Sequence, residues 1–534
     1  VTALTAESLT ITLAYRQRNL QLFTKKKRYA VEHDATDGPA AQQLRNLFGL
    51  LTATTDRQDL LLGRRSPQRN LALTLRGSYP ETVESIVLQA KQAQDYYLLV
   101  GPPGTGKTNL ALRSMVKEYL LEAATHTADV TYLKSHALLL SAYTNRAVDE
   151  ICSMLDDLSQ ELTFDYLRIG NPQTCATAHH AHLLSERAAT LPRREDVRHL
   201  IDTVPIIVGT VITLTNNRML FRRKTFATAI LDEASQLLEP QVMGLLTARQ
   251  QERQAIGKFI LIGDHKQLPA VVMLPESQTQ TQSQTLRAIG LTDLRNSLFE
   301  RLHQQEAAHG RTAFVGMLYK QGRMHPDIAT FVNRYFYDSR LTPVPLPHQT
   351  ETLQWAHADG PYEQLVARTR LGFIPVSQTA QAENLRANAP EAEAVCLLAQ
   401  ALCSLHAKNG QTDFQPAHSI GVIVPFRSQI AGIRSALRQH GFNWADEVTI
   451  DTVECYQGSQ RDYILFSTTI SEPYQLDILS SIQEVENCPV DRKLNVALTR
   501  ARRQLFLFGN PQILNQNPLY KALIASCTVM QSDW

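Results

Sequence analysis

The sequence has no apolar run long enough to cross a membrane as a helix. Stretches such as "FILI" (259–262) and "YYLLV" (96–100) are far shorter than the roughly 18 residues that a spanning helix needs. The N-terminus also lacks the basic-then-apolar pattern of a secretory signal. We therefore expect a cytoplasmic, or at least intracellular, protein with no membrane partner.

Cysteine pairs at metal-binding or redox spacing are also missing. No two of the seven cysteines stand in a C-x-x-C arrangement, so neither a zinc ribbon nor a disulfide framework is indicated. We predict that they are reduced and mostly buried. They are Cys152, Cys175, Cys396, Cys403, Cys455, Cys488 and Cys527.

The segment "CATAHHAH" (175–182) gathers one cysteine and three histidines, which are zinc ligands in principle. Its spacing fits no common structural zinc site. We therefore expect a solvated helix or loop.

An excess of charge of one sign is absent as well. The chain has 53 Lys and Arg against 51 Asp and Glu, a net charge of +2. Bulk charge reports only an average, and a local groove can still be basic, so nucleic-acid binding stays open. With 43% hydrophobic and 19% charged residues, the 534-residue chain has the composition of a globular protein of two to four domains.

Strand patterns alternate with helix patterns along most of the chain, which is typical of a parallel sheet covered by helices. The N-terminal part differs. "LTITLAYRQRNLQLF" (9–23) alternates like a strand, whereas "AAQQLRNLFGLLTATTDRQDLLLG" (40–63) has helical spacing and ends on glycine. We predict an accessory region over residues 1–78.

Two polar segments stand out in this pattern. "TKKKRY" (24–29) could contact a phosphate backbone, although a short charge run is more often a solvated face. "PESQTQTQSQTL" (275–286) has low complexity, and we expect it to be a mobile loop.

"YYLLVGPPGTGKTNLALRSMVKEYL" (96–120) joins an apolar run to a G-x-x-x-x-G-K-[ST] loop and an amphipathic helix. Glycines let backbone N–H groups face a phosphate, and the helix aims its positive end at it. Lys107 then bridges the outer phosphates and Thr108 holds Mg²⁺. We predict a site for ATP and Mg²⁺. Its residues are Gly101, Pro102, Pro103, Gly104, Thr105, Gly106, Lys107, Thr108 and Asn109.

Carboxylates follow a second strand, "TFATAILDEASQ". Asp232 is expected to hold Mg²⁺ with Thr108, and Glu233 to take the proton from an attacking water. This pair predicts hydrolysis rather than transfer to a substrate hydroxyl. A third strand, "KFILIGDHKQLPAVV", ends near Gln267, whose amide can contact both water and the γ-phosphate.

Seven segments then appear in a fixed order: "GPPGTGKT", "LDEASQ", "GDHKQLPAVV", "LYKQGRMHPDIATF", "VIVPFRSQI", "TVECYQGSQRDYILFS" and "RKLNVALTRAR". Over roughly residues 80–512 the chain resembles the superfamily 1 helicases, in the branch of the nonsense-mediated decay helicase and the replicative nuclease-helicase. The resemblance implies an α/β fold of two tandem RecA-like P-loop domains. We place the accessory region, a stalk or barrel remnant, at 1–78, and the two domains at 79–314 and 315–534.

By this resemblance, Arg500 is an arginine finger that reaches across the cleft to the γ-phosphate. Arg323 does the same from the start of the second domain, and Gln460 stands at a nucleotide-contacting position. Such fingers raise rates by roughly 10³ to 10⁵. The other nearby cations are expected to support local structure in solvent. They are Arg492, Lys493, Arg502 and Arg503.

The same motif match predicts single-strand contacts from loops on the opposite edge of the two sheets. Hydroxyls, amides and backbone N–H groups suit phosphate and sugar contact without base recognition. Each of these residues, taken alone, is equally well explained as a turn residue. That explanation fails for the whole set. The residues are Thr144, Asn145, Thr210, Pro425, Arg427, Thr452 and Gln457.

Three positions depart from the family pattern. Gly322 stands where an aromatic ring is usual, and Gln460 where an acidic residue is usual. "YPETVESIVLQ" offers Glu81 or Glu84 in place of an N-x-x-Q motif. All three concern the base and ribose, so we expect hydrolysis to persist with a loosely held base.

The predicted function is an ATP-dependent helicase or translocase on single-stranded nucleic acid, DNA rather than RNA, moving 5′ to 3′. The alternative is a nucleotide-gated clamp or sensor without processive unwinding. The oligomeric state stays open. Val1 in place of Met indicates a processed product or a fragment, in which case a nuclease domain or partner is expected. The helicase prediction depends on Lys107, Thr108, Asp232, Glu233, Gln267, Arg323 and Arg500.

Overall fold

A computed structural model of the chain divides it into two compact units, residues 1–42 and 43–534. In the first unit, β1 (Ala3–Leu4) pairs antiparallel with β2 (Leu9–Thr10). The strand expected over 9–23 is thus described only at its start, and the "TKKKRY" run lies outside the described residues. The structure describes residues 3–4, 9–10, 38–126, 129–272, 274–376, 386–485 and 488–530.

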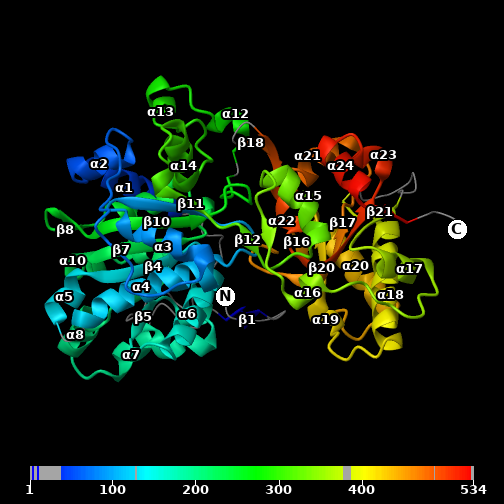
Figure 1. The fold of residues 1–534 in the computed structure, drawn as a ribbon, viewed down its shortest axis with the longest axis horizontal. Helices are drawn as coiled ribbons and strands as arrows, with labels where there is room; N and C mark the ends of the chain where they lie inside the picture. Colours follow the sequence, from blue (N-terminus) through cyan, green and yellow to red (C-terminus); the bar gives the residue numbers. More distant parts are fainter. Residues whose placement is uncertain are drawn as a thin grey trace, which may run out of the picture. The chain divides into compact units, whose positions relative to one another are not determined.

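A parallel seven-stranded sheet, in the order β11-β3-β10-β7-β4-β6-β5, forms the first core of the second unit (Figure 1). Its central strands are continuous apolar runs because helices cover both faces. The strands are β3 (Tyr96–Val100), β4 (Ala137–Ala142), β5 (Tyr166–Ile169), β6 (Ile206–Thr210), β7 (Phe226–Asp232), β10 (Ile256–Gly263) and β11 (Val315–Met317).

Helices pack on this sheet through apolar stripes. In α6, Val148, Ile151, Leu155 and Leu158 recur at helical spacing and are buried. The α-helices of this part are α1 (Gly38–Thr52), α2 (Thr55–Leu61), α3 (Glu81–Gln92), α4 (Arg113–Ala123), α5 (Val130–Ser135), α6 (Asn145–Ser159), α7 (Leu184–Thr190), α8 (Arg194–Thr203), α9 (Val211–Asn216), α10 (Arg218–Arg223), α11 (Glu239–Leu246), α12 (Glu276–Thr279), α13 (Gln284–Ala288) and α14 (Leu298–Ala308). Shorter or non-α turns are η2 (Lys107–Leu112), η3 (Ala124–His126), η4 (Pro172–Thr174), η5 (Thr177–His182), η6 (Ala234–Gln236) and η7 (Thr312–Phe314).

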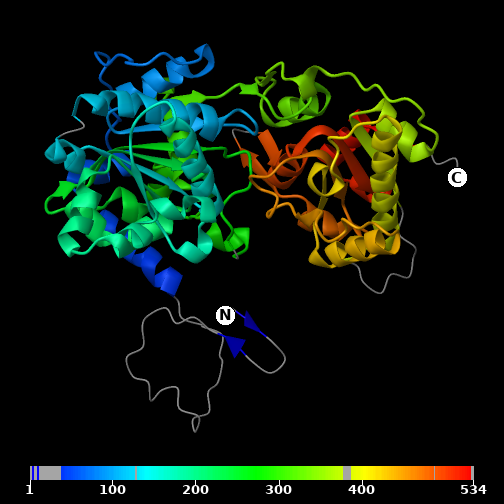
Figure 2. The same ribbon diagram turned by 90° about the horizontal axis from the view of Figure 1, so that it is seen from below.

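A second parallel sheet has six strands in the order β16-β15-β17-β20-β14-β21. Figure 2 shows helices around this sheet as around the first. Its strands are β14 (Leu371–Pro375), β15 (Ile420–Val424), β16 (Thr449–Thr452), β17 (Arg461–Ser467), β20 (Ala501–Gly509) and β21 (Thr528–Val529). Its helices are α15 (Pro326–Phe336), α16 (Pro347–Thr350), α17 (Pro361–Arg368), α18 (Ala389–Lys408), α19 (Pro416–Ser419), α20 (Arg427–Gln439), η8 (Pro473–Gln475), α21 (Leu476–Leu479), α22 (Arg492–Leu498), α23 (Pro511–Leu514) and α24 (Pro518–Ser526).

Three two-stranded ribbons complete these parts. They are β8 (Arg249–Gln250) with β9 (Arg253–Gln254), β12 (Lys320–Gln321) with β13 (Thr342–Pro343), and β18 (Ile482–Val485) with β19 (Cys488–Asp491). We call the elements from α2 to β11 the first lobe and those from β12 to β21 the second lobe.

Each lobe has its own buried apolar core. The first runs from Leu60 to Leu318, and the second, in two clusters, runs from Met324 to Leu523 and also takes in Leu268 of the first lobe. The expected fold of two parallel sheets covered by helices is confirmed. The domain limits drawn at 78 and 314 stay predictions, and β11, beyond residue 314, belongs to the first sheet.

Several local expectations can be compared with the structure. The helical pattern over 40–63 is confirmed by α1 and α2. The loop expected over 275–286 is wrong, because it contains α12 and the start of α13. Among the seven cysteines, all unpaired, three are buried, so the expected general burial is also wrong.

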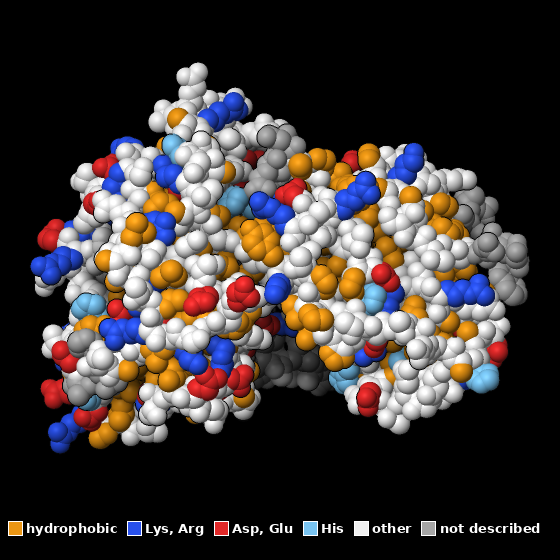
Figure 3. All heavy atoms as spheres, in the orientation of Figure 1, with side chains coloured by type: hydrophobic (Ala, Val, Ile, Leu, Met, Phe, Trp, Pro, Cys, Tyr) orange, Lys and Arg blue, Asp and Glu red, His pale blue; other side chains and the backbone are white. Residues whose placement is uncertain are grey.

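The described helices include none with the length and apolarity to cross a membrane. On the face of the molecule seen in Figure 3, basic and acidic side chains are interspersed. This distribution matches the small net charge of the chain. A basic groove, where one exists, must therefore come from a local arrangement of side chains and not from an overall excess of positive charge.

Candidate active site

The loop after β3 folds into a cradle. Gly104 and Gly106 have φ angles of +73° and +82°, in the left-handed region that glycine adopts without a Cβ clash. Lys107 starts η2, and its Nζ donates a hydrogen bond to the Gly101 carbonyl at 2.8 Å. A Cβ on Gly101 would lie 2.2 Å from the Lys107 Cγ. Glycine therefore lets the lysine fold over the loop.

Asp232 ends β7 beside this loop. Because β3, β10 and β7 are parallel neighbours, their carboxyl ends meet at one edge of the sheet. The Thr108 hydroxyl donates to Asp232 Oδ2 at 2.8 Å. Burial, with the charge of Glu233, raises the pKa of the Asp232 carboxyl to about 6 against the opposing charge of Lys107.

The backbone of Glu233 is strained. Its φ of +53° lies in the left-handed region, which costs on the order of 1–3 kcal/mol for a residue with a side chain. Its N–H donates to Asp232 Oδ1 at 2.8 Å, and its carboxylate accepts from Gln236 Nε2 at 2.9 Å. Glu233 thus places a proton acceptor in the wall of the cavity that Lys107 also lines.

Gln267, after β10, is oriented by hydrogen bonds from both lobes. Its Nε2 donates to Asp264 Oδ2 at 2.7 Å, and the hydroxyl of Tyr337, just after α15, donates to the same oxygen at 2.6 Å. The amide oxygen of Gln267 is left facing Arg500, whose Nη2 lies 3.5 Å away.

Arg323 and Arg500 of the second lobe are held by neutral groups. Arg323 Nε donates to Gln460 Oε1 at 2.8 Å, and its Nη1 to the Thr499 carbonyl at 3.3 Å. Arg500 donates to two backbone carbonyls and to the Thr499 hydroxyl. In the part of the chain that the structure describes, neither guanidinium forms an ion pair.

Neither guanidinium has a described carboxylate within ion-pair distance, although the charge of Glu233 favours the protonated form of both. Burial lowers the pKa of Arg323 to about 10, and burial together with the neighbouring Arg323 lowers the pKa of Arg500 to about 9. Both stay protonated at neutral pH. Arg500 is buried and Arg323 is half-buried, and an anion that enters the cavity they share is stabilised by both.

The predicted site residues converge on one cavity of about 780 Å³ between the lobes. Gly101 and Asp232 adjoin it through Lys107 and Thr108. Lining residues that the sequence predicted are Pro102, Pro103, Gly104, Thr105, Gly106, Lys107, Thr108, Asn109, Glu233, Gln267, Arg323, Gln460 and Arg500.

The donor set fits a magnesium nucleotide. Thr108 and Asp232 offer a hydroxyl and a carboxylate, hard oxygen ligands that suit Mg²⁺. Within the described ranges, no three His, Cys, Asp or Glu side chains cluster as a metal cage. Mg²⁺ is typically held by one or two carboxylates together with phosphates, so the two findings agree.

One wall of the cavity is formed by a segment that the site predicted from the sequence did not include. Leu346, just before α16, takes the space beside Gly322, where an added Cβ would lie 3.0 Å from Leu346 Cδ1. His348 Nε2 lies 2.9 Å from the Arg323 carbonyl. Tyr319 lines a different cavity, so it does not supply the ring that Gly322 lacks. No motif marks this segment, because only the fold brings it to the site.

The loops predicted to contact a single strand follow parallel strands. Thr144 and Thr210 cap α6 and α9, and each hydroxyl accepts a backbone N–H at 3.2 Å. They follow β4 and β6, which run parallel to β7. These loops therefore lie on the same edge of the sheet as the nucleotide cavity. The prediction that they lie on the opposite edge is wrong for the first lobe.

The second lobe differs. Arg427 and Thr452 lie at the carboxyl ends of β15 and β16, with Pro425 beside Arg427, whereas Gln460 and Arg500 precede β17 and β20. These strands are parallel, so Pro425, Arg427 and Thr452 lie on the edge opposite Gln460 and Arg500, as expected. Gln457 does not, because it stands next to Gly458, which lines the nucleotide cavity.

Only part of the predicted strand-contact set comes together. Thr144 and Gln457 line a second inter-lobe cavity of about 590 Å³, which shares Glu233 with the first. The other predicted contacts line neither of these two cavities. They are Asn145, Thr210, Pro425, Arg427 and Thr452.

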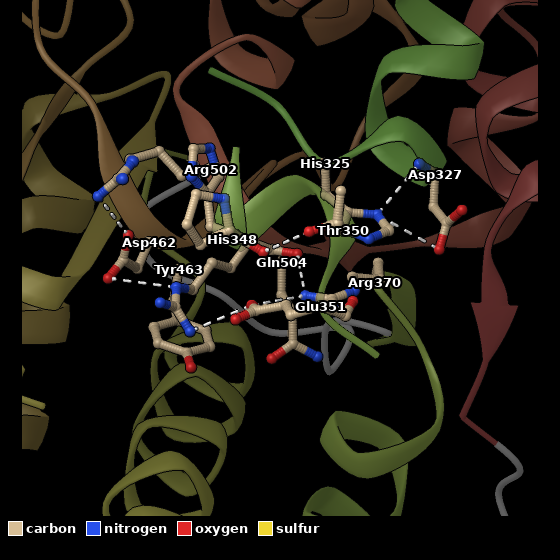
Figure 4. A network of polar contacts seen from close by, with 12 residues as sticks. His325, Asp327, His348, Thr350, Glu351, Arg370, Asp462, Tyr463, Arg502 and Gln504 are labelled. Carbon is tan, nitrogen blue, oxygen red and sulfur yellow. Dashed lines mark hydrogen bonds and ion pairs between the residues drawn. The ribbon is translucent and has the colours of Figure 1, made fainter. Parts of the chain in front are cut away.

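The arginines at the start of β20 pair with acidic side chains, as Figure 4 shows for Arg502. Arg502 lies 2.9 Å from Asp462, and Arg503 lies 3.1 Å from Glu351. Both support local structure as expected, although Arg502 also lines the nucleotide cavity.

Lys493 and Arg492, on α22, differ from each other. Lys493 pairs with Glu454 at 3.5 Å near the surface. Arg492 is buried and pairs with Glu300 of the first lobe at 2.8 Å. The expectation that Arg492 lies in solvent is therefore wrong.

The histidine-rich segment forms η5 and packs on α6. His179 is buried, with Nδ1 at 3.0 Å from Asp156 and Nε2 at 3.2 Å from Ser153. The expected helix or loop is present, but its central histidine is not solvated.

Two family models, each described as an AAA domain, match this chain. One matches residues 81–195 and 184–275, and the other matches 294–512. Together they include the P-loop, the Asp232–Glu233 pair and both cavity arginines.

Curated relatives match over most of the chain. The human "DNA replication ATP-dependent helicase/nuclease DNA2" is 27% identical over 557 residues, 97% of this chain and 46% of the relative. The Mus musculus protein of the same name is 27% identical over 543 residues, 94% and 45%. "Helicase sen1" of Schizosaccharomyces pombe is 28% identical over 335 residues, 62% and 17%. The chain thus spans less than half the length of these relatives.

Solved structures give weaker likenesses. S. cerevisiae Dbp5 bound to RNA and ADP BeF3 aligns with a TM-score of 0.39 at 10% identity, over 86% of this chain and 94% of that chain. An arterivirus nonstructural protein 10 helicase with DNA aligns with a TM-score of 0.34 at 13% identity, over 83% and 65%. Scores at this level add nothing to the description of the fold.

The fold and the site define a class, a P-loop protein with two parallel-sheet lobes and a cavity lined by both. With its AAA-domain matches and its DNA2 and Sen1 relatives, the chain belongs to the superfamily 1 helicases.

Proposed function

We propose that the chain is an ATP-dependent helicase or translocase, which hydrolyses ATP between its lobes and moves along single-stranded nucleic acid. One observation carries this proposal. Arg323 and Arg500, two cations of the second lobe without ion-pair partners among the described residues, share a cavity with Lys107 of the first lobe. A polyanion that bridges the lobes is the ligand that neutralises all three.

The chemistry follows from the residues around this cavity. Lys107 binds the outer phosphates, while Thr108 and Asp232 hold Mg²⁺, which neutralises phosphate charge when bound. Glu233 takes the proton from the attacking water, and Gln267 orients that water. Arg323 and Arg500 stabilise the negative charge that grows on the transferred phosphoryl group.

For the nucleic acid we propose single-stranded DNA rather than RNA, with movement 5′ to 3′. The names of the DNA2 relatives refer to DNA replication. Thr144 and Gln457 offer a hydroxyl and an amide at the second cavity, groups that contact sugar and phosphate without base recognition. The nuclease activity in the relatives' names is not part of this proposal, and the expected intracellular location stays a prediction.

ATP turnover, measured with and without single-stranded DNA or RNA of one sequence, tests the proposal, together with displacement of an annealed oligonucleotide from 5′ and 3′ overhangs. We expect DNA to stimulate turnover and a 5′ overhang to permit displacement. Stimulated turnover without displacement would instead support the nucleotide-gated clamp. Absence of ATP turnover under every condition would overturn both.

A further inference from the structure

Two neighbouring residues of α14 form buried ion pairs in different directions. Glu300 pairs with Arg492 of α22 in the second lobe at 2.8 Å, and their side chains are only 6% and 2% exposed. Arg301 pairs with Glu239 of α11, within the first lobe. One helix thus carries a buried pair that joins the lobes and a matched pair that does not.

The helix that Glu300 binds leads directly to Arg500. Arg492 is the first residue of α22, and Arg500 follows two residues after its end at Leu498. One turn after Arg492, Asn495 Nδ2 donates to the Lys266 carbonyl at 2.7 Å, next to Gln267. Successive turns of α22 are therefore anchored on the first lobe before the chain reaches the nucleotide cavity.

Anchors on this helix set the position of its far end. A helix rises about 1.5 Å per residue, so α22 extends about 9 Å from Arg492 to Leu498, and Arg500 follows two residues beyond that end. A buried arginine cannot slide away from Glu300 without leaving a charge unpaired in a dry environment. The ion pair therefore resists both axial movement and rotation of α22.

We propose that Glu300 is a positioning residue for the arginine finger, which sets how deeply Arg500 enters the nucleotide cavity. This inference rests on the proposed ATPase function. Glu300 does not line the cavity, so it acts only through Arg492 and α22. A displacement of about 1 Å at a reacting group can cost about 100-fold in rate.

The test compares Glu300→Gln with Glu239→Gln in the full chain. Both variants keep side-chain shape and break a buried pair on α14, but only the first pair reaches α22. Melting temperature, kcat and KM for nucleic-acid-stimulated ATP turnover are measured below the lowest melting transition. We expect Glu300→Gln to lower kcat about 10- to 100-fold with KM within about threefold. Glu239→Gln should lower the melting temperature and leave kcat within about twofold.

A double-mutant cycle tests whether the pair acts as a unit. If it does, Glu300→Gln combined with Arg492→Gln lowers kcat no more than the worse single variant. If Glu300→Gln fails to fold, Glu300→Asp, which keeps the charge but withdraws it by one methylene, should still lower kcat with KM preserved.

Three outcomes would overturn the inference. The first is an unchanged kcat in Glu300→Gln, and the second is an equal loss of kcat in Glu300→Gln and Glu239→Gln. The third is an additive loss of kcat in the double variant. Each would show that the Glu300–Arg492 pair has only a structural role. These results presuppose an active parent protein. A parent without ATP turnover contradicts the proposed function itself, and the inference falls with it.

Discussion

The backbone N–H of Gly322, in the second lobe, donates a hydrogen bond to the Gly104 carbonyl of the P-loop at 2.8 Å. Arg323, the next residue, packs so closely that a Cβ on Gly104 would lie 2.4 Å from its own Cβ. The phosphate cradle of one lobe is therefore in direct backbone contact with the arginine segment of the other. This contact joins the two lobes without an intervening side chain.

Replacement of Glu233 by glutamine should abolish ATP turnover and leave nucleotide binding intact. The amide keeps the shape of the side chain and its contact with Gln236, but it cannot accept a proton from water. Turnover and the affinity for a fluorescent ATP analogue are measured on the same preparation. An equal loss of binding would contradict the role given to Glu233.

Arg500→Ala should lower kcat by roughly 10³ to 10⁵ with little change in nucleotide affinity, because a finger acts mainly on transition-state charge. Arg502→Ala is a matched control, since Arg502 lines the same cavity but is paired with Asp462. We expect kcat of the Arg502→Ala control to fall by less than about tenfold. Steady-state kinetics of both variants check this, and a kcat unchanged in Arg500→Ala would place the finger elsewhere.

Gly322 should leave the base loosely held, with weak discrimination between ATP and GTP. Stacking on an aromatic side chain is worth about 1–3 kcal/mol, and Gly322 provides none. A tyrosine at this position needs Leu346, a partly exposed side chain, to shift slightly. We compare kcat/KM for ATP and GTP in the parent and in Gly322→Tyr. A preference that appears only in the variant supports this account, whereas a marked ATP preference in the parent contradicts it.

Glu391, near the start of α18, should make stability fall as pH rises. Burial raises the pKa of its carboxyl to about 8, although Ser467 and the Thr469 N–H donate to it. Between its ordinary pKa near 4.5 and about 8, the folded chain keeps a proton that the unfolded chain releases, so the free energy of unfolding decreases across this window.

Glu391→Gln removes this titration. We measure the free energy of unfolding by urea from about pH 5 to about pH 8. Relative to the parent, the free energy of unfolding of the variant should increase by about 1 kcal/mol per pH unit. A stability difference that does not change with pH would show that the folded carboxyl is already ionised.

The sequence predicted those parts of the site that depend on local pattern and on one rule of topology. The P-loop is a short run whose spacing dictates its backbone. Thr108 and Asp232, 124 residues apart, meet because parallel strands end at a common edge. The same rule, applied without the strand order, misplaced Thr144 and Thr210 on the opposite edge of the first sheet.

Local sequence pattern did not predict the short helices or the contacts between the lobes. The polar run over 275–286 contains α12 and the start of α13, and its Thr279 and Thr281 are buried. Isolated helices of this length are unstable in water, so tertiary packing rather than propensity forms them.

By itself the sequence determined the class of fold, the phosphate cradle and the carboxylate pair, because each depends on neighbours in the chain or on strand periodicity. Only the tertiary structure decided that Leu346 stands beside Gly322, that Arg323 and Arg500 lack counter-ions among the described residues, and that Arg492 is buried against Glu300. Burial and pairing depend on which surfaces meet across hundreds of residues. No local pattern encodes that meeting.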